Sequence, residues 1–143
     1  DGKILQIGTP TDLYSNPNTP FIADFVGTSN ILTGEIIGSK DGFTTVQIGN
    51  QRIKSATLTD KKQVDVVIRP ENIRVLNGEN DETGNTFEGE IQLATYLGSI
   101  VRYDVKVGEN SLLVDTTYES GDSIKSKGST IRLSVSPERV LLI

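Results

Sequence analysis

The 143-residue chain, with 35% hydrophobic and 23% charged residues, has the composition of a globular domain and enough length to bury a core. Its net charge of −5 disfavours binding to phosphate backbones, which depends on lysine and arginine, so we expect no nucleic-acid partner. The sequence has no cysteine and no histidine, which excludes disulfides, thiolate chemistry and imidazole metal ligands. Its apolar runs are far too short for a membrane-spanning helix, so we expect no direct membrane insertion.

The first 30 residues have the pattern of a connecting segment. Residues 1–3 (Asp-Gly-Lys) are typical of a hairpin turn that leads into a strand at residues 4–7, and that strand needs an earlier partner. We therefore expect these residues to continue a longer chain. Two short helices follow, each opened by a Thr-Pro pair, at residues 9–10 and 19–20. The second helix has an apolar face that packs either on the β region that follows or on a preceding domain. This face consists of Phe21, Ile22, Phe25 and Val26.

From residue 31 onward the hydrophobic period changes to two, which predicts β-strands. Nine short strands are expected, at residues 31–37, 43–48, 51–55, 64–69, 86–97, 100–107, 111–117, 130–135 and 140–143. Turn residues separate the strands and no long helix intervenes, so the pattern predicts a mainly β fold, either a barrel or a sandwich.

The same pattern predicts the domain organisation. Residues 1–30 are expected to end a preceding domain and to form a helical connector, and residues 31–143 to form one β domain. The polar segment at residues 77–85 divides the strands, so two lobes are possible within that domain. One lobe would comprise residues 31–76 plus 130–143, and the other residues 86–118.

Two proline corners interrupt the strand pattern at similar places. Pro70 and Pro137 each follow an alternating strand, precede a glutamate and lead to further apolar residues. Because proline cannot donate to a sheet ladder, a strand ends at each corner, and the likeness predicts two pseudo-equivalent strand exits. We interpret Arg69, Pro70 and Glu71 as a structural corner in which the two charged side chains pair, in preference to a ligand contact.

No catalytic, cofactor-binding or metal-binding residues are predicted. One acidic segment has calcium-loop spacing, with oxygen-bearing side chains at Glu79, Asp81, Thr83 and Glu90 and the turn glycine at Gly84. The first position of such a loop should be aspartate and its flanks should be helical, so a solvated loop is the better interpretation. The chain also lacks the G-x-x-x-x-G-K-[ST] and G-x-G-x-x-G patterns that cradle phosphates, so it should neither bind nor hydrolyse ATP.

Several segments resemble parts of ABC importer subunits. DGKILQIGTPTDLYSNPNTPFIADFVGTSN resembles the segment that follows the ATPase core in the nucleotide-binding subunits of these importers. VVIRPENIRV, TYLGSIVRYDVKV and SPERVLLI resemble their C-terminal transport-associated OB (TOBE) domain, most closely that of the spermidine/putrescine import ATPase family. The resemblance covers essentially the whole chain and implies an OB-like fold. It also implies that ATP, Mg and the catalytic residues belong to a preceding ATPase domain.

The resemblance implies a noncatalytic regulatory and dimerisation domain that couples ATP hydrolysis on the preceding domain to polyamine import. The implied partners are the ATPase domain of the same chain, a second copy of the subunit and membrane permease subunits, at the cytoplasmic face of the plasma membrane. An alternative is a small-ligand sensor, for a polyamine or an oxyanion, in a sugar, iron or molybdate-type importer. The acidic composition favours a cation over an oxyanion.

Overall fold

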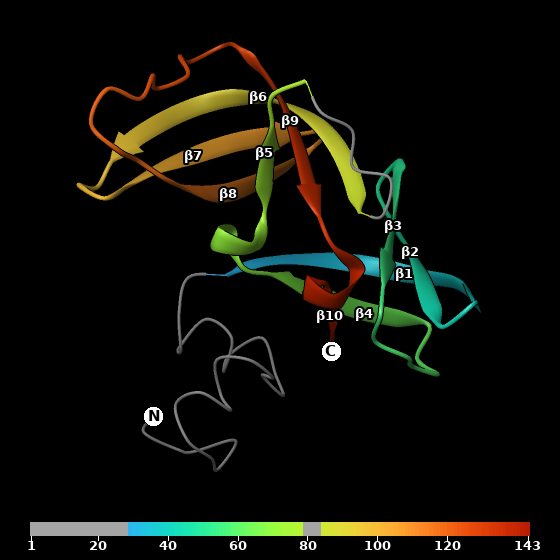
Figure 1. Cartoon of the computed structure of the whole chain (residues 1–143). Helices are drawn as coiled ribbons and strands as arrows, with labels where there is room; N and C mark the ends of the chain where they lie inside the picture. Colours follow the sequence, from blue (N-terminus) through green and yellow to red (C-terminus); the bar gives the residue numbers. More distant parts are fainter. Residues whose placement is uncertain (1–28, 79–83) are drawn as a thin grey trace, which may run out of the picture.

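The fold is formed by short β-strands. The computed structural model describes residues 29–78 and 84–143 of the chain. Ten strands lie in these two ranges (Figure 1): β1 (Asn30–Lys40), β2 (Phe43–Ile48), β3 (Gln51–Ser55), β4 (Gln63–Ile68), β5 (Arg74–Leu76), β6 (Asn85–Tyr96), β7 (Ile100–Val107), β8 (Asn110–Thr117), β9 (Thr130–Val135) and β10 (Leu141–Leu142). Two 3-10 helices, η1 (Pro70–Asn72) and η2 (Pro137–Arg139), are the other elements of the described part. The prediction of a mainly β fold is confirmed.

The two predicted helices, with Phe21, Ile22, Phe25 and Val26, lie outside the described residues. Each of the nine predicted strands coincides with an observed one. The sequence pattern misses one strand, β5. It has three residues, too few for alternation to be recognised. Its partner is β9, from the other end of the domain, so the pairing is not visible in the local sequence.

The strands form two five-stranded antiparallel sheets that lie one above the other (Figure 1). One sheet has the order β10-β4-β1-β2-β3, and the second has the order β5-β9-β6-β7-β8. The last strand of each half of the chain belongs to the other half's sheet, because β5 pairs with β9 and β10 pairs with β4. Of the residues 130–143 that the sequence pattern groups with residues 31–76, β10 pairs with β4, and β9 pairs on one side with β5 and on the other with β6.

The two halves of the domain are internal repeats. The elements β1 to β5 with η1, and β6 to β10 with η2, follow one another in the same order. Residues 30–36 of β1 read Asn-Ile-Leu-Thr-Gly-Glu-Ile, and residues 85–91 of β6 read Asn-Thr-Phe-Glu-Gly-Glu-Ile. In both the β1–β2 and the β6–β7 hairpin, the register shifts directly after the final isoleucine of this motif. We call residues 30–76 repeat one and residues 85–142 repeat two.

The glycine of each motif marks a close approach between strands. A Cβ atom at Gly34 would lie 2.4 Å from Val46 Cγ1, and one at Gly89 would lie 2.5 Å from Val105 Cγ1. Only a residue without a side chain fits at such distances. Glycine therefore lets a valine of the next strand pack directly over the backbone of the first strand in each repeat.

The two proline corners are pseudo-equivalent, as predicted. The residue before η1, Arg69, has φ −78° and ψ 140°, and the residue before η2, Ser136, has φ −73° and ψ 148°. Pro70 and Pro137 are both buried. The corner η1 contacts β8 of repeat two, and η2 contacts β3 of repeat one. Each corner thus carries the chain across to the opposite repeat.

One hydrophobic core is shared by the two repeats. Repeat one contributes Val46 and Val66, and repeat two contributes Val105, Val114 and Leu133, all of them fully buried. Because each sheet covers the inner face of the other, neither repeat buries its apolar face alone.

Candidate functional site

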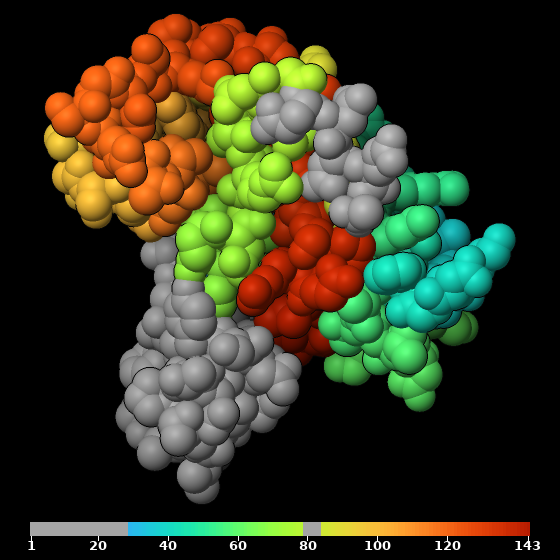
Figure 2. Space-filling model, viewed as in Figure 1, coloured from blue at the N-terminus to red at the C-terminus, as the bar shows by residue number. Residues whose placement is uncertain are grey.

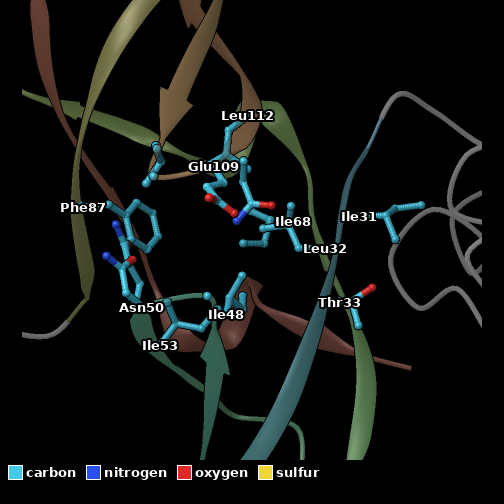
Figure 3. Close-up of a pocket in the computed structure, with 15 residues that line it drawn as sticks. Ile31, Leu32, Thr33, Ile48, Asn50, Ile53, Ile68, Phe87, Glu109 and Leu112 are labelled. Carbon is cyan, nitrogen blue, oxygen red and sulfur yellow. The ribbon is translucent and has the colours of Figure 1, made fainter.

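A cavity with a volume of about 680 Å³ lies between the two sheets. This volume lies within the range of small-molecule pockets. Figure 3 shows Leu32, Ile48, Ile53, Phe87 and Leu112 around it, while neighbouring Ile31 and Thr33 project from the other side of β1. The walls are thus formed mainly by branched aliphatic side chains and one phenylalanine.

The cavity is built from equivalent positions of the two repeats. The register of the hairpins makes Leu32 equivalent to Phe87, Ile48 to Val107, and Ile53 to Leu112, and all six residues line the cavity. Its rim is formed by the β2–β3 turn (residues 49–51) and the β7–β8 turn (residues 108–110). The two repeats therefore contribute equivalent side chains and equivalent turns to the same cavity.

The rim differs chemically from the walls. It presents the amides of Asn50, Gln51 and Asn110 together with the carboxylate of Glu109. Among the described residues that line the cavity, Glu109 is the only charged one. A negative rim over apolar walls is complementary to an ammonium group that carries an apolar chain, and it lacks the lysine or arginine that an oxyanion needs.

Asparagine side chains hold the two seams where the sheets meet. Asn30, at the start of β1, accepts a hydrogen bond from the Leu113 amide (2.7 Å) and donates to the Leu113 carbonyl (2.9 Å). Asn85, at the start of β6, makes the same pair with the backbone of Lys54, at 2.7 and 2.9 Å. Leu113 and Lys54 lie on the edge strands β8 and β3, directly beside the cavity residues Leu112 and Ile53. Each repeat therefore anchors the edge strand of the other repeat next to the cavity.

The predicted corner residues lie apart from this cavity, beside the junction between η1 and β8. Arg69 is buried, which lowers the pKa of its guanidinium, and it donates to the Ser29 hydroxyl at 3.3 Å. Pro70 is the first residue of η1, and Glu71 follows it at the surface. The predicted pairing of Arg69 with Glu71 stays a prediction.

An ion pair on the outer face of repeat two stands close to this corner. Arg102 donates to both carboxylate oxygens of Asp115, at 2.7 Å from Nε and 2.9 Å from a terminal nitrogen. The hydrogen bond to Asp115, helped by the charge of Asp115 and of Glu71, raises the pKa of Arg102. Glu71 thus lies within electrostatic range of Arg102, a relation between η1 and β7 that the sequence pattern does not reveal.

The acidic segment with calcium-loop spacing, which we interpret as a solvated loop, lies partly outside the described residues. Glu79, Asp81 and Thr83 belong to the undescribed segment, and Glu90 is exposed on β6. Among residues 29–78 and 84–143, no group of three or more acidic side chains is placed to hold a metal ion.

The sequence reasoning misses the residues that build the cavity rim and the seams. The repeated Asn-x-x-x-Gly-Glu-Ile motif at residues 30–36 and 85–91 is the signal that could have found Asn30 and Asn85. The equivalence of the two glycine turns then follows from counting along each hairpin. The turns look like ordinary hairpin connections because nothing local shows that they meet.

Comparison with solved structures places the fold. The cytoplasmic molybdate-binding protein ModG, with molybdate bound, superposes with a TM-score of 0.69 over 79% of this chain and 94% of that chain. The sequence identity is 14%, so the likeness shows the fold alone. In the part of the chain that the structure describes, no helix has the length and hydropathy needed to span a bilayer.

Comparison with protein families and curated relatives identifies the chain. The spermidine/putrescine import ATP-binding protein PotA of Thermobifida fusca is 33% identical over 142 residues, which is 96% of this chain and 37% of that protein. The protein of the same name from Trichormus variabilis is 38% identical over 115 residues, or 74% of this chain and 29% of that protein. The chain thus spans about a third of the length of these relatives. The TOBE domain model matches residues 66–143, more than half of the chain, and the chain therefore belongs to the TOBE domain family.

Proposed function

We propose that this chain is the C-terminal regulatory and dimerisation domain of the ATP-binding subunit of an ABC importer for polyamines. The observation that carries the proposal is the match of nearly the whole chain, 96%, to part of a spermidine/putrescine import ATP-binding protein. The match to the TOBE domain family over residues 66–143 supports the same assignment.

The proposal divides the work between two parts of one subunit. ATP and Mg bind to a preceding ATPase domain, and the TOBE domain carries no catalytic residue of its own. The partners are that ATPase domain, a second copy of the subunit and the membrane permease subunits, at the cytoplasmic face of the plasma membrane. The shared core and the exchanged strands support a rigid unit, suited to transmitting a change at one surface to another.

The proposal is tested by removing residues 31–143 from the full-length subunit and measuring uptake of labelled putrescine by cells that also contain the permease. We expect uptake to lose its regulation or to fall, while uptake of an unrelated sugar stays unchanged. Unchanged putrescine uptake, with its usual response to intracellular polyamine, would contradict the proposal.

A second candidate function is ligand sensing, and the cavity between the repeats is the observation that favours it. Its apolar walls and its single carboxylate, Glu109, support an organic amine as the ligand rather than an oxyanion. The sensed ligand would then be a polyamine, whose ammonium group meets the rim and whose alkyl chain lies along Leu32, Ile48 and Phe87.

Calorimetric titration of the chain with spermidine at moderate salt tests this candidate. We expect Glu109→Gln to weaken binding by about tenfold, because it removes one charge-assisted contact. Glu119→Gln is the matched control, since Glu119 is exposed and outside the cavity lining. Equal binding by both variants, or tight binding of molybdate in place of spermidine, would rule this candidate out.

A further inference from the structure

Repeat two contains two insertions that repeat one lacks. The hairpin pair Lys40 and Phe43 of repeat one corresponds to Thr95 and Arg102 of repeat two. Residues 96–101 therefore occupy the place that residues 41–42 occupy in repeat one. The connection from β8 to β9 spans residues 118–129, whereas the connection from β3 to β4 spans residues 56–62.

The two insertions contact each other and form one end of the molecule. The amide of Tyr118 donates to the carbonyl of Ser99 at 2.9 Å. The rings of Tyr118 and Tyr96 meet edge to face, with centroids 5.0 Å apart. Figures 1 and 2 show this end on the left, where the β6–β7 hairpin and the segment after β8 lie side by side. We call residues 93–99 the repeat-two tip.

The repeat-two tip exposes large apolar side chains. Leu93, Tyr96 and Leu97 are exposed by 58%, 58% and 49%. The corresponding end of repeat one is polar, since residues 39–42 read Ser-Lys-Asp-Gly. Tyr96 packs on Tyr118 within the chain. The short hairpin of repeat one folds without counterparts of Leu93 and Leu97, so these two leucines are not required by the shared fold. An apolar surface that the fold does not need is typical of a docking site.

The tip also presents a strand edge without the usual protection. The ladder between β6 and β9 ends at Glu90, and two further bonds join Ile91 to residues 128–129. Beyond that point no described strand pairs with the outer edge of β6. Exposed edges are normally blunted by lysine or proline, and repeat one has Lys40 at this place. The edge of repeat two has no charge between Glu90 and Arg102.

The charge pattern indicates what the tip binds. The chain carries a net charge of −5, so most surfaces of two copies repel each other, and contact between copies is favoured at an uncharged surface. Residues 91–101 form the longest uncharged stretch in the described part of the chain. A basic partner or an anionic membrane would call for one sign of charge, but residues 93–99 carry no charge and the adjoining segment 118–129 carries two acidic and two basic residues. An uncharged antiparallel edge is complementary to its own copy across a twofold axis.

We propose that the repeat-two tip is the surface through which two copies of this chain associate, tip to tip, with Leu93, Tyr96 and Leu97 at its centre. This inference rests on the dimerisation part of the proposed function and assigns it to one surface. The exposed edge of β6 supplies backbone groups, and the three side chains supply the apolar contact.

The association is tested by sedimentation equilibrium of the 143-residue chain over a wide concentration range. The double variant L93Q/L97Q should raise the dimer dissociation constant by at least about tenfold, because apolar anchors at the centre of an interface dominate affinity. Leu58→Gln is the matched control, since Leu58 is 67% exposed on repeat one, and it should leave the constant unchanged. Thermal melts establish that both variants remain folded.

Cross-linking gives an independent readout, because the chain contains no cysteine. Under oxidation, Leu97→Cys should form a covalent dimer and Leu58→Cys should not. A monomeric wild-type chain at all concentrations would overturn the inference. A dimer that survives L93Q/L97Q, or that cross-links equally through Leu58→Cys, would also overturn it while leaving dimerisation through another surface intact. The regulatory function is judged separately, by the deletion assay on putrescine uptake.

Discussion

The two repeats of this domain share one scaffold and differ at their ends. Both have an asparagine that holds an edge strand, a glycine beneath a valine, a register shift after an isoleucine and a proline corner. Repeat one ends in a short polar turn, whereas repeat two carries two insertions and an apolar tip. The shared features are those that the fold requires, and the differences include the surface that we propose for association between copies.

Substitution of the two motif glycines, Gly34 and Gly89, tests whether both repeats need a residue without a side chain at this position. The Gly89 variant should lower the free energy of unfolding more than any other variant considered below. At Gly89 an added Cβ would lie 2.8 Å from the carbonyl oxygen of Lys106, a backbone atom that cannot move aside. At Gly34 the obstacles are the side chains of Val46, Val66 and Ile48. We expect Gly89→Ala to lower the free energy of unfolding by about 3 kcal/mol and Gly34→Ala by about 1 to 2 kcal/mol.

Urea denaturation of the two glycine variants measures this difference. Gly38→Ala is the control, because nothing lies within 4 Å of a Cβ at that position. Equal losses of unfolding free energy for Gly34→Ala and Gly89→Ala would contradict the prediction. They would show that the backbone contact at Gly89 is no harder to relieve than the side-chain contacts at Gly34.

Substitution of the two seam asparagines, Asn30 and Asn85, should lower the free energy of unfolding by different amounts, and this difference should be smaller than the one between the glycine variants. Asn30 is only 7% exposed, whereas the hydrogen bonds between Asn85 and Lys54 are exposed to solvent. Water can replace a lost bond at the exposed seam, but at the buried seam the Leu113 groups would stay unpaired. We expect Asn30→Ala to cost about 2 kcal/mol and Asn85→Ala about 1 kcal/mol.

Hydrogen exchange at the backbone amides of Leu113 and Lys54 measures the opening of each seam separately. Asn30→Ala should speed exchange at Leu113, and Asn85→Ala should speed exchange at Lys54, each without affecting the other seam. Loss of protection at both amides in either variant would mean that the seams open together, contrary to the account of two independent anchors.

The ion pair of repeat two has the smallest expected effect. Arg102 and Asp115 correspond to Phe43 and Ala56 in repeat one, so the pair is not part of the shared scaffold. Their side chains are 31% and 11% exposed, and we expect Asp115→Asn to cost about 1 kcal/mol at low salt and less at high salt.

Asp104 provides the control on the same strand. One of its carboxylate oxygens is buried without a hydrogen-bond partner in the described structure. Asp104→Asn removes that buried charge, so melting curves should show no loss of stability. A larger loss of stability for Asp104→Asn than for Asp115→Asn would contradict the prediction that Asp115 stabilises the domain through its ion pair and that Asp104 does not.

Much of the fold could be predicted from the sequence because alternation and turn residues act locally. The strand Val101, Tyr103, Val105 and Val107 is buried on one side, as its period of two requires. The corners at Pro70 and Pro137 could be found because proline has one local effect wherever it occurs. The three-residue strand β5 could not be found, since it depends on a distant partner.

The candidate site could not be predicted from local patterns. Asn50 and Glu109 belong to turns on different hairpins, and only the pairing of the two repeats brings them to one rim. At the exposed tip the sequence pattern predicts only a connection between the strands at residues 86–97 and 100–107, because a turn signal says nothing about which surface surrounds it. Comparison of the two repeats reveals both the cavity rim and the repeat-two tip. Equivalent turns identify the rim, and residues present in only one repeat identify the tip.

The central proposal is that this domain regulates ATP hydrolysis on a preceding ATPase domain and takes no part in the chemistry. The most direct measurement is the ATPase rate of the full-length subunit, with and without residues 31–143, at saturating MgATP and over a range of spermidine concentrations. The account predicts that the truncated protein still hydrolyses ATP and that its rate no longer responds to spermidine. Loss of all hydrolysis in a truncated protein that remains folded, or an unchanged response to spermidine, would contradict it.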